Sequence, residues 1–106
     1  MGRFVIAAYK SKPGREEQLL AAVRKHYGVL RAENLVSDKP PHVMRAGDGT
    51  IVEVFEWLSS EAVERAHANA AVRALWAEFD AACDSVPIGR LAESQQMFSE
   101  FESLTP

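Results

Sequence analysis

The stretch IVEVFEWLSSEAVERAHANAAVRALWAEF, residues 51–79, decides the fold of this chain. Residues 50–58 are rich in β-branched and aromatic side chains, which predicts a strand near the centre of a sheet. Ser59 or Ser60 then stands where a helix N-cap is expected, and Glu61 suits the positive end of the helix dipole. A strand therefore passes through a capped turn into a helical layer.

The helical layer carries apolar residues every three or four positions as far as residue 85. Its first part is rich in alanine, and we expect a bend at residues 67–70 with Asn69 capping the second part. The apolar stripe of the second part is Val72, Leu75, Trp76, Phe79, Ala82 and Cys83. These residues predict most of the core, and Cys83 fits a small core residue better than a nucleophile.

The other elements follow from period and turn residues. Residues 4–9 are apolar at both odd and even positions, which predicts a strand buried on both faces. In residues 15–33 the apolar residues recur at helical spacing, which predicts a helix. A hairpin is expected from residues 42–46, the turn 47–49 and the strand 50–58. Residues 88–92 are predicted as a last short strand, and residues 94–106 as a tail that packs on the domain or on a partner.

The element order is β-α-β-β-α-β over one domain, residues 1–106, which is typical of an α+β ferredoxin-like fold with an antiparallel four-stranded sheet. Both helices then cover one face of the sheet. Because the strand residues that point to either face of the sheet are apolar, the face without helices also needs a cover, and a second copy of the chain is the simplest one. We therefore expect a homodimer through the open sheet face, with a pocket between sheet and helices in each subunit.

The composition excludes several classes of protein. The formal charge of −3 and the absence of a basic run argue against a nucleic-acid partner. No apolar run approaches the roughly 20 residues of a membrane span. A single cysteine and an N-terminus without a signal-peptide pattern predict a cytoplasmic setting.

The element order, the KPG sequence at residues 12–14 and the passage EWLSSEAVERAH at residues 56–67 resemble the dimeric α+β barrel family. Within it the chain is similar to the antibiotic biosynthesis monooxygenase group, over residues 4–104. The resemblance implies homodimers and a pocket between sheet and helices. It also implies a choice among cofactor-free oxygenases of phenolic substrates, haem-degrading enzymes and proteins without an assigned reaction.

Three residues are candidates for catalysis. A cofactor-free oxygenase needs a base that removes a phenolic proton, and His67, on the alanine-rich turn, has a side chain suited to that role. Glu53 and Glu56 lie on opposite faces of the central strand, so either could orient the histidine or act as a base. The alternative for His67 is a surface or pocket-lining residue, and for each acid a structural ion pair, for example with Arg45.

Candidate ligand-binding residues surround this region. Phe55 and Trp57 share a strand face and, with Trp76, could stack against a planar ligand or simply form core. Tyr9 closes the first strand, and His42 lies at the mouth of the hairpin. Either could line the pocket or be an ordinary strand-end residue. The remaining histidine, His26, is expected on the solvated side of the first helix.

The sequence thus predicts a small cofactor-independent monooxygenase that acts on an aromatic, phenolic or quinol-type ligand. The alternative is a non-catalytic dimer that binds a small hydrophobic ligand or serves a stress response. Haem degradation is disfavoured, because the first strand offers Ala7 and Ala8 where the haem-degrading branch of the family would have an asparagine. No bound cofactor is expected, and three histidines on separate elements do not predict a metal site.

Overall fold

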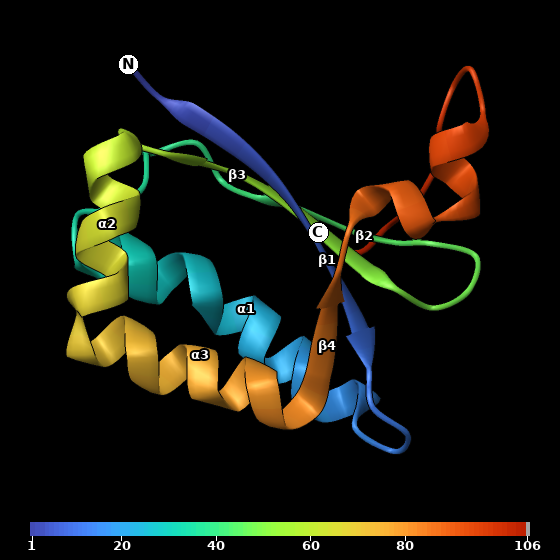
Figure 1. The fold of residues 1–106 in the computed structure, drawn as a ribbon, viewed down its shortest axis with the longest axis horizontal. Helices are drawn as coiled ribbons and strands as arrows, with labels where there is room; N and C mark the ends of the chain where they lie inside the picture. Colours follow the sequence, from blue (N-terminus) through green and yellow to red (C-terminus); the bar gives the residue numbers. More distant parts are fainter. Residues whose placement is uncertain (106) are drawn as a thin grey trace.

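The computed structural model describes residues 1–105, and Pro106, the last residue of the expected tail, lies outside the described residues. The strands are β1 (Arg3–Ser11), β2 (His42–Arg45), β3 (Ile51–Trp57), β4 (Cys83–Val86) and β5 (Glu102–Ser103). The helices are α1 (Glu16–Ala32), α2 (Ser60–Ala68), α3 (Ala70–Ala82) and two short 3-10 helices, η1 (Ile88–Arg90) and η2 (Ala92–Gln95). Figure 1 shows their arrangement.

The sheet is antiparallel, with the strand order β4-β1-β3-β2-β5. This small α+β arrangement is compatible with a ferredoxin-like fold, and the prediction that residues 50–58 form a central strand is confirmed. The prediction of four strands is wrong, because the tail adds β5 along the outer edge of β2. There Met44 pairs with Ser103 and Arg45 with Glu102.

The prediction of a last strand at residues 88–92 is wrong. The fourth strand is β4, residues 83–86, whereas residues 88–90 form the 3-10 helix η1. The chain leaves α3 at Ala82 and becomes extended at once at Cys83, which is buried at the start of β4. Pro87 then ends the strand because it has no N–H for the ladder. The sequence predicts helix to residue 85 because the helical spacing of apolar residues includes Ala82 and Cys83.

The bend in the helical layer occurs where the sequence predicts it. Asn69 is both the last cap of α2 and the first cap of α3, and its side-chain oxygen accepts a hydrogen bond of 3.0 Å from the N–H of Val72. Ser59 caps α2 in the same way by accepting from the N–H of Ala62 at 3.1 Å. These two caps, each worth about 1 kcal/mol, fix the direction of both helices over the sheet.

The helices lie on one face of the sheet and the tail lies on the other (Figure 1). On the tail side Leu91 packs against Ala8 and Val52, which are buried. The tail covers only part of this face, since Phe4 and Ile6 are 65% and 55% exposed. The prediction that residues 4–9 are buried on both faces therefore fails for the first half of β1 in the single chain.

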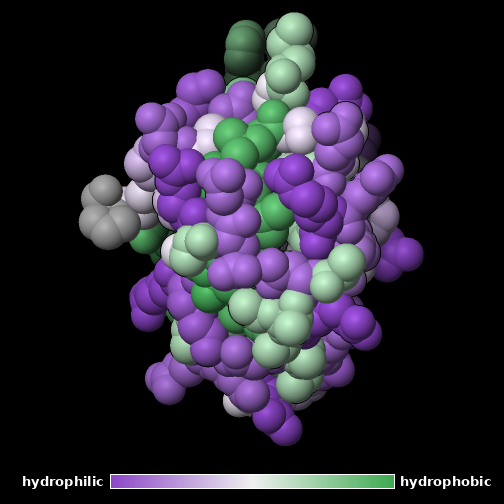
Figure 2. Space-filling model, turned by 90° about the vertical axis from the view of Figure 1, so that its left-hand side faces the viewer, coloured by the Kyte–Doolittle hydropathy of each residue, from purple (hydrophilic) through white to green (hydrophobic). Residues whose placement is uncertain are grey.

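The surface on the side of α2 is mixed. Figure 2 shows hydrophobic side chains in a broken patch between hydrophilic ones, with no large uniform area on that side. No helix among residues 1–105 is long and apolar enough to span a membrane.

Candidate functional site

A cavity of about 340 Å³ lies between the helical layer and the sheet. Its aromatic wall consists of Tyr9, Phe55, Trp57, Trp76 and Phe79, and the rest of the lining is Val5, Ala7, His26, Asp80 and Ser85. The strand residues come from one face of β1 and β3, where Val5 pairs with Phe55 and Tyr9 with Ile51. Its volume and apolar lining fit a small, flat ligand.

A buried polar network forms one side of this cavity. The carboxylate of Glu53 is fully buried, and its Oε1 accepts hydrogen bonds of 2.8 Å from the hydroxyl of Tyr9 and from Nδ1 of His26. Its other oxygen, Oε2, has no hydrogen-bond partner among the described residues. A buried carboxylate needs such donors, since desolvation of its charge is otherwise costly.

The two partners of His26 determine the tautomer of its ring. Nδ1 faces a carboxylate oxygen of Glu53, whereas Nε2 lies 3.2 Å from Nε1 of Trp76, which can only donate. The ring therefore carries its proton on Nδ1, and Nε2 is the acceptor. The carboxylate thus orients the imidazole and leaves Nε2 as its acceptor nitrogen, as in other carboxylate–histidine pairs.

The expectation that His26 is solvated is wrong, because the residue is only 3% exposed. Its position on α1 explains the burial: it lies seven residues after Leu19, three after Val23 and four before Leu30, all on the buried face of the helix. This spacing was readable in the sequence. A histidine at i+7 among apolar residues at i, i+4 and i+11 is the signal for a buried histidine.

Aromatic rings enclose the network. The ring of His26 packs edge-on against Phe55 and Phe79, with centroids 5.4 and 4.9 Å apart, and Phe79 also contacts Tyr9 at 4.9 Å. Burial raises the pKa of the Tyr9 phenol far above its usual value, and the adjacent carboxylate of Glu53 raises it further. Tyr9 is therefore a proton donor to Glu53 over the whole physiological range.

His67 lies outside this network. It is exposed, and its Nδ1 lies 2.9 Å from the backbone oxygen of Val63. Ala66 points into the core, so the next residue is turned by about 100° toward solvent. The ring of His67 still packs on Trp76, with centroids 5.0 Å apart, but no contact joins it to Glu53 or Glu56.

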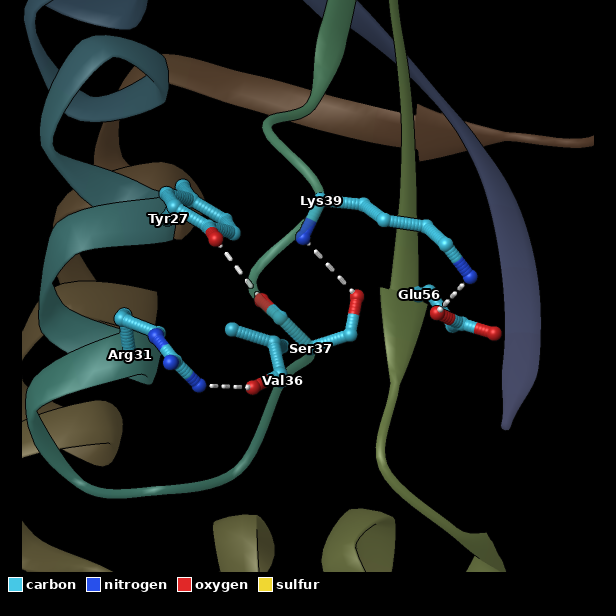
Figure 3. Close-up of polar contacts among 6 residues, drawn as sticks. All are labelled: Tyr27, Arg31, Val36, Ser37, Lys39 and Glu56. Carbon is cyan, nitrogen blue, oxygen red and sulfur yellow. Dashed lines mark hydrogen bonds and ion pairs between the residues drawn. The ribbon is translucent and has the colours of Figure 1, made fainter. Parts of the chain in front are cut away.

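Glu56 and His42 are on the opposite face of the sheet from the cavity. Figure 3 shows Glu56 beside the loop that precedes β2, where its Oε1 accepts a hydrogen bond of 3.0 Å from Nζ of Lys39. This hydrogen bond lowers the pKa of the Glu56 carboxyl, with a smaller contribution from the Ser37 hydroxyl. His42 is exposed and pairs with Val54, and Arg45 forms its ion pair with Glu102 rather than with either acid of β3.

The same loop is tied to α1, as Figure 3 also shows. The hydroxyl of Tyr27 donates to the backbone oxygen of Ser37 at 2.7 Å, and Arg31 donates to that of Val36 at 3.0 Å. These bonds hold the loop against the helix and so position Lys39 beside Glu56. Glu56 has no part in the cavity because strand alternation places it on the other face of the sheet.

Of the predicted site residues, Tyr9, Phe55, Trp57 and Trp76 line the cavity, and Glu53 joins them through its hydrogen bonds to Tyr9 and His26. The cavity leaves out His42, Glu56 and His67. Within residues 1–105 no group of three or more histidine, cysteine or acidic side chains is arranged to hold a metal ion. Comparison of the chain with family models, curated proteins and solved structures gives no significant match. The class that the fold and the cavity define is a small α+β domain with an aromatic pocket and a buried carboxylate–histidine pair.

Proposed function

We propose that this chain is a small cofactor-independent monooxygenase that acts on a phenolic or quinol-type ligand, with His26 as the base. The observation that carries the proposal is the imidazole of His26, held by the buried carboxylate of Glu53 at the wall of an aromatic cavity. This assignment replaces His67, whose ring is exposed, with the histidine that lines the cavity.

The proposed chemistry begins with a phenol stacked between the aromatic side chains. Its hydroxyl donates to Nε2 of His26 in place of the indole N–H of Trp76, and the ring becomes an imidazolium stabilised by Glu53. The indole N–H is then available to donate to the phenolate oxygen. The electron-rich phenolate reduces dioxygen, one oxygen atom adds to the ring to give a quinone, and the other leaves as water.

Oxygen uptake tests the proposal. Phenols and hydroxynaphthalenes are supplied in air-saturated buffer, and wild type is compared with His26→Gln and with the matched surface variant His67→Gln. Loss of a general base lowers the turnover rate by about 100-fold or more, so His26→Gln should be nearly inactive and His67→Gln close to wild type. Equal rates for wild type and folded His26→Gln would exclude His26 as the base.

A non-catalytic ligand-binding role is the second candidate, and one observation favours it. Nε2 of His26 already has a hydrogen-bond donor in Trp76, so the network is largely satisfied without a substrate. In that case aromatic ligands bind in the cavity and quench the fluorescence of Trp57 and Trp76, but no oxygen is consumed. A fluorescence titration with the same phenols, together with the measurement of oxygen uptake, therefore separates the two functions.

We also propose that two copies associate through the sheet face opposite the helices. Phe4 and Ile6 are exposed there, beside the partly buried Val54, and a large apolar patch on a monomer commonly marks an interface. Sedimentation should give twice the mass of 11.7 kDa at micromolar concentration, and Ile6→Lys should give the single mass. A wild-type monomer at that concentration would refute the dimer.

A further inference from the structure

The cavity is lined by a charged side chain, Asp80, as well as by the acceptor nitrogen of His26. Among its lining residues, Asp80 is the only one with a formal charge at pH 7 when His26 is neutral, and Ser85 adds a hydroxyl. The lining contains no lysine or arginine. A ligand in this cavity therefore meets an acceptor at His26 and a negative charge at Asp80.

The carboxylate of Asp80 has no ion-pair partner among the described residues. Lys12 approaches the same residue, but its Nζ donates to the backbone oxygen of Asp80 at 2.8 Å. The nearest acid on α3, Glu78, is paired with Lys25 at 2.6 Å and does not line the cavity. Asp80 is thus the acid on this helix that is available to a ligand.

The spacing of the two polar ends is set by α3. Trp76 marks the His26 end, because its indole N–H contacts Nε2, and Asp80 follows four residues later. Four residues of α-helix rise about 6 Å, which is comparable to the width of one or two fused aromatic rings. Phe79, between them in sequence on α3, also lines the cavity.

We infer that the cavity selects an aromatic molecule with an acidic hydroxyl at one end and a cationic amine at the other, and that it rejects the matching carboxylate. The inference rests on the proposed function for the hydroxyl end only. The amine donates to the Asp80 carboxylate and the Ser85 hydroxyl, whereas a carboxylate at the same place is repelled by Asp80 and has no cation in the lining to pair with.

Calorimetric titration with three matched ligands tests this inference: a naphthol, the same naphthol with an aminomethyl group on its second ring, and the same naphthol with a carboxyl group there. Because Asp80 is exposed to solvent, which screens its charge, the amine should bind only about three- to five-fold tighter than the parent naphthol. The carboxylate should bind about ten-fold more weakly than the amine. Added salt should compress both differences.

Two variants of Asp80 and one control complete the experiment. Asp80→Asn should abolish the preference for the amine, and Asp80→Lys should reverse the order in favour of the carboxylate. Asp84→Asn removes the same charge from an exposed residue of β4 outside the cavity lining and should leave the wild-type order. An unchanged order in Asp80→Asn, or equal affinity for amine and carboxylate in wild type, would overturn the inference.

Binding and turnover are read separately, so the two proposals fail separately. If the three ligands bind in the expected order but consume no oxygen, the inference stands and the oxygenase function falls. If they are oxidised without an order of affinity, the oxygenase function stands and the inference falls. If none of the three binds, the inference is wrong for this cavity.

Discussion

Glu53 and Glu56 are two carboxylates three residues apart on β3, and the strand points them to opposite faces of the sheet. Glu53 lies under the helical layer, fully buried, with two donors on one oxygen. Glu56 lies on the far face, where Lys39 contacts it from a surface loop. The residue type and the strand are the same, and only the covering layer differs.

The covering layer decides what each carboxylate can do. Under the helices the dielectric constant is low, so the hydrogen bonds from Tyr9 and His26 are strong. Removing either donor leaves the buried carboxylate charge with fewer partners. At the surface, water and salt screen the pair of Glu56 with Lys39, and such pairs contribute little to stability. Of the two carboxylates, only the buried one holds a histidine in one tautomer.

The largest expected difference is in stability. Glu53→Ala removes the acceptor of two buried donors and leaves a cavity, which should lower the free energy of unfolding by about 3–5 kcal/mol. Glu56→Ala removes a solvent-screened pair and should change it only slightly. Urea unfolding followed by circular dichroism measures both.

Glu53→Gln sharpens this first prediction. The amide oxygen can still accept from Tyr9 and His26, so most of the stability should return while the negative charge does not. If Glu53→Ala were as stable as Glu56→Ala, the buried network would contribute nothing to the free energy of unfolding, and the two faces would not differ in the way proposed.

The next difference concerns the two histidines on either side of Trp76. His26→Ala leaves Glu53 with one donor, Trp76 without an acceptor and a gap among aromatic rings, and should cost about 2–4 kcal/mol. His67→Ala alters an exposed helix position and should stay within about 0.5 kcal/mol. Thermal melts of both variants measure this, and similar midpoints would show that His26 is not an integral part of the core.

Much of the fold was predictable from local rules. The central strand at residues 51–57, with its β-branched and aromatic side chains, the Ser59 and Asn69 caps and the turn at residues 47–49 each follow from one short pattern and its geometry. Gly49, for example, adopts a φ of 93°, which favours glycine. The fourth strand was missed because the helical spacing of apolar residues continues to Cys83, and only the pairing of residues 83–86 with residues 8–11 of β1 shows that they form a strand.

The site was predictable only in part. The strand period places Glu53, Phe55 and Trp57 on one face, but it does not tell which face the helices cover. The partner of Glu53 comes from α1, 27 residues away, and its identity depends on how that helix is rotated over the sheet. His67 drew attention because of its alanine neighbours, yet one residue of helical rotation separates it from the core.

The third prediction uses alkaline pH. In the folded chain, burial raises the pKa of Cys83 to about 11 and raises that of Tyr9 as well, so the unfolded chain releases these protons first, near 9.0 and 10.0. The folded state then binds more protons, and the free energy of unfolding falls as pH rises above about 9. Chemical unfolding at pH 7, 9, 10 and 11 should show this fall.

Tyr9→Phe separates the tyrosine from the cysteine. It should destabilise the chain at pH 7 by about 1–3 kcal/mol, because Glu53 loses a donor, and it should make the fall above pH 9 shallower. Tyr27→Phe is the matched control, since the hydroxyl of Tyr27 donates to a neutral backbone carbonyl rather than to a carboxylate. A wild-type slope in Tyr9→Phe would contradict the raised pKa of the buried Tyr9 phenol.

The smallest effect is expected on the far face of the sheet. Lys39 lowers the pKa of Glu56, so this carboxyl should titrate below its usual value of 4.5 in carbon-detected NMR. A lowered folded pKa contributes stability above the unfolded value, and that contribution is lost as pH falls through the folded pKa. Lys39→Ala should move the titration of Glu56 back toward 4.5 and leave the ring signals of His26 unchanged. A shift of the His26 signals in Lys39→Ala would mean that the two faces are coupled through β3, whereas unchanged signals would show that the sheet insulates the buried carboxylate from surface charge.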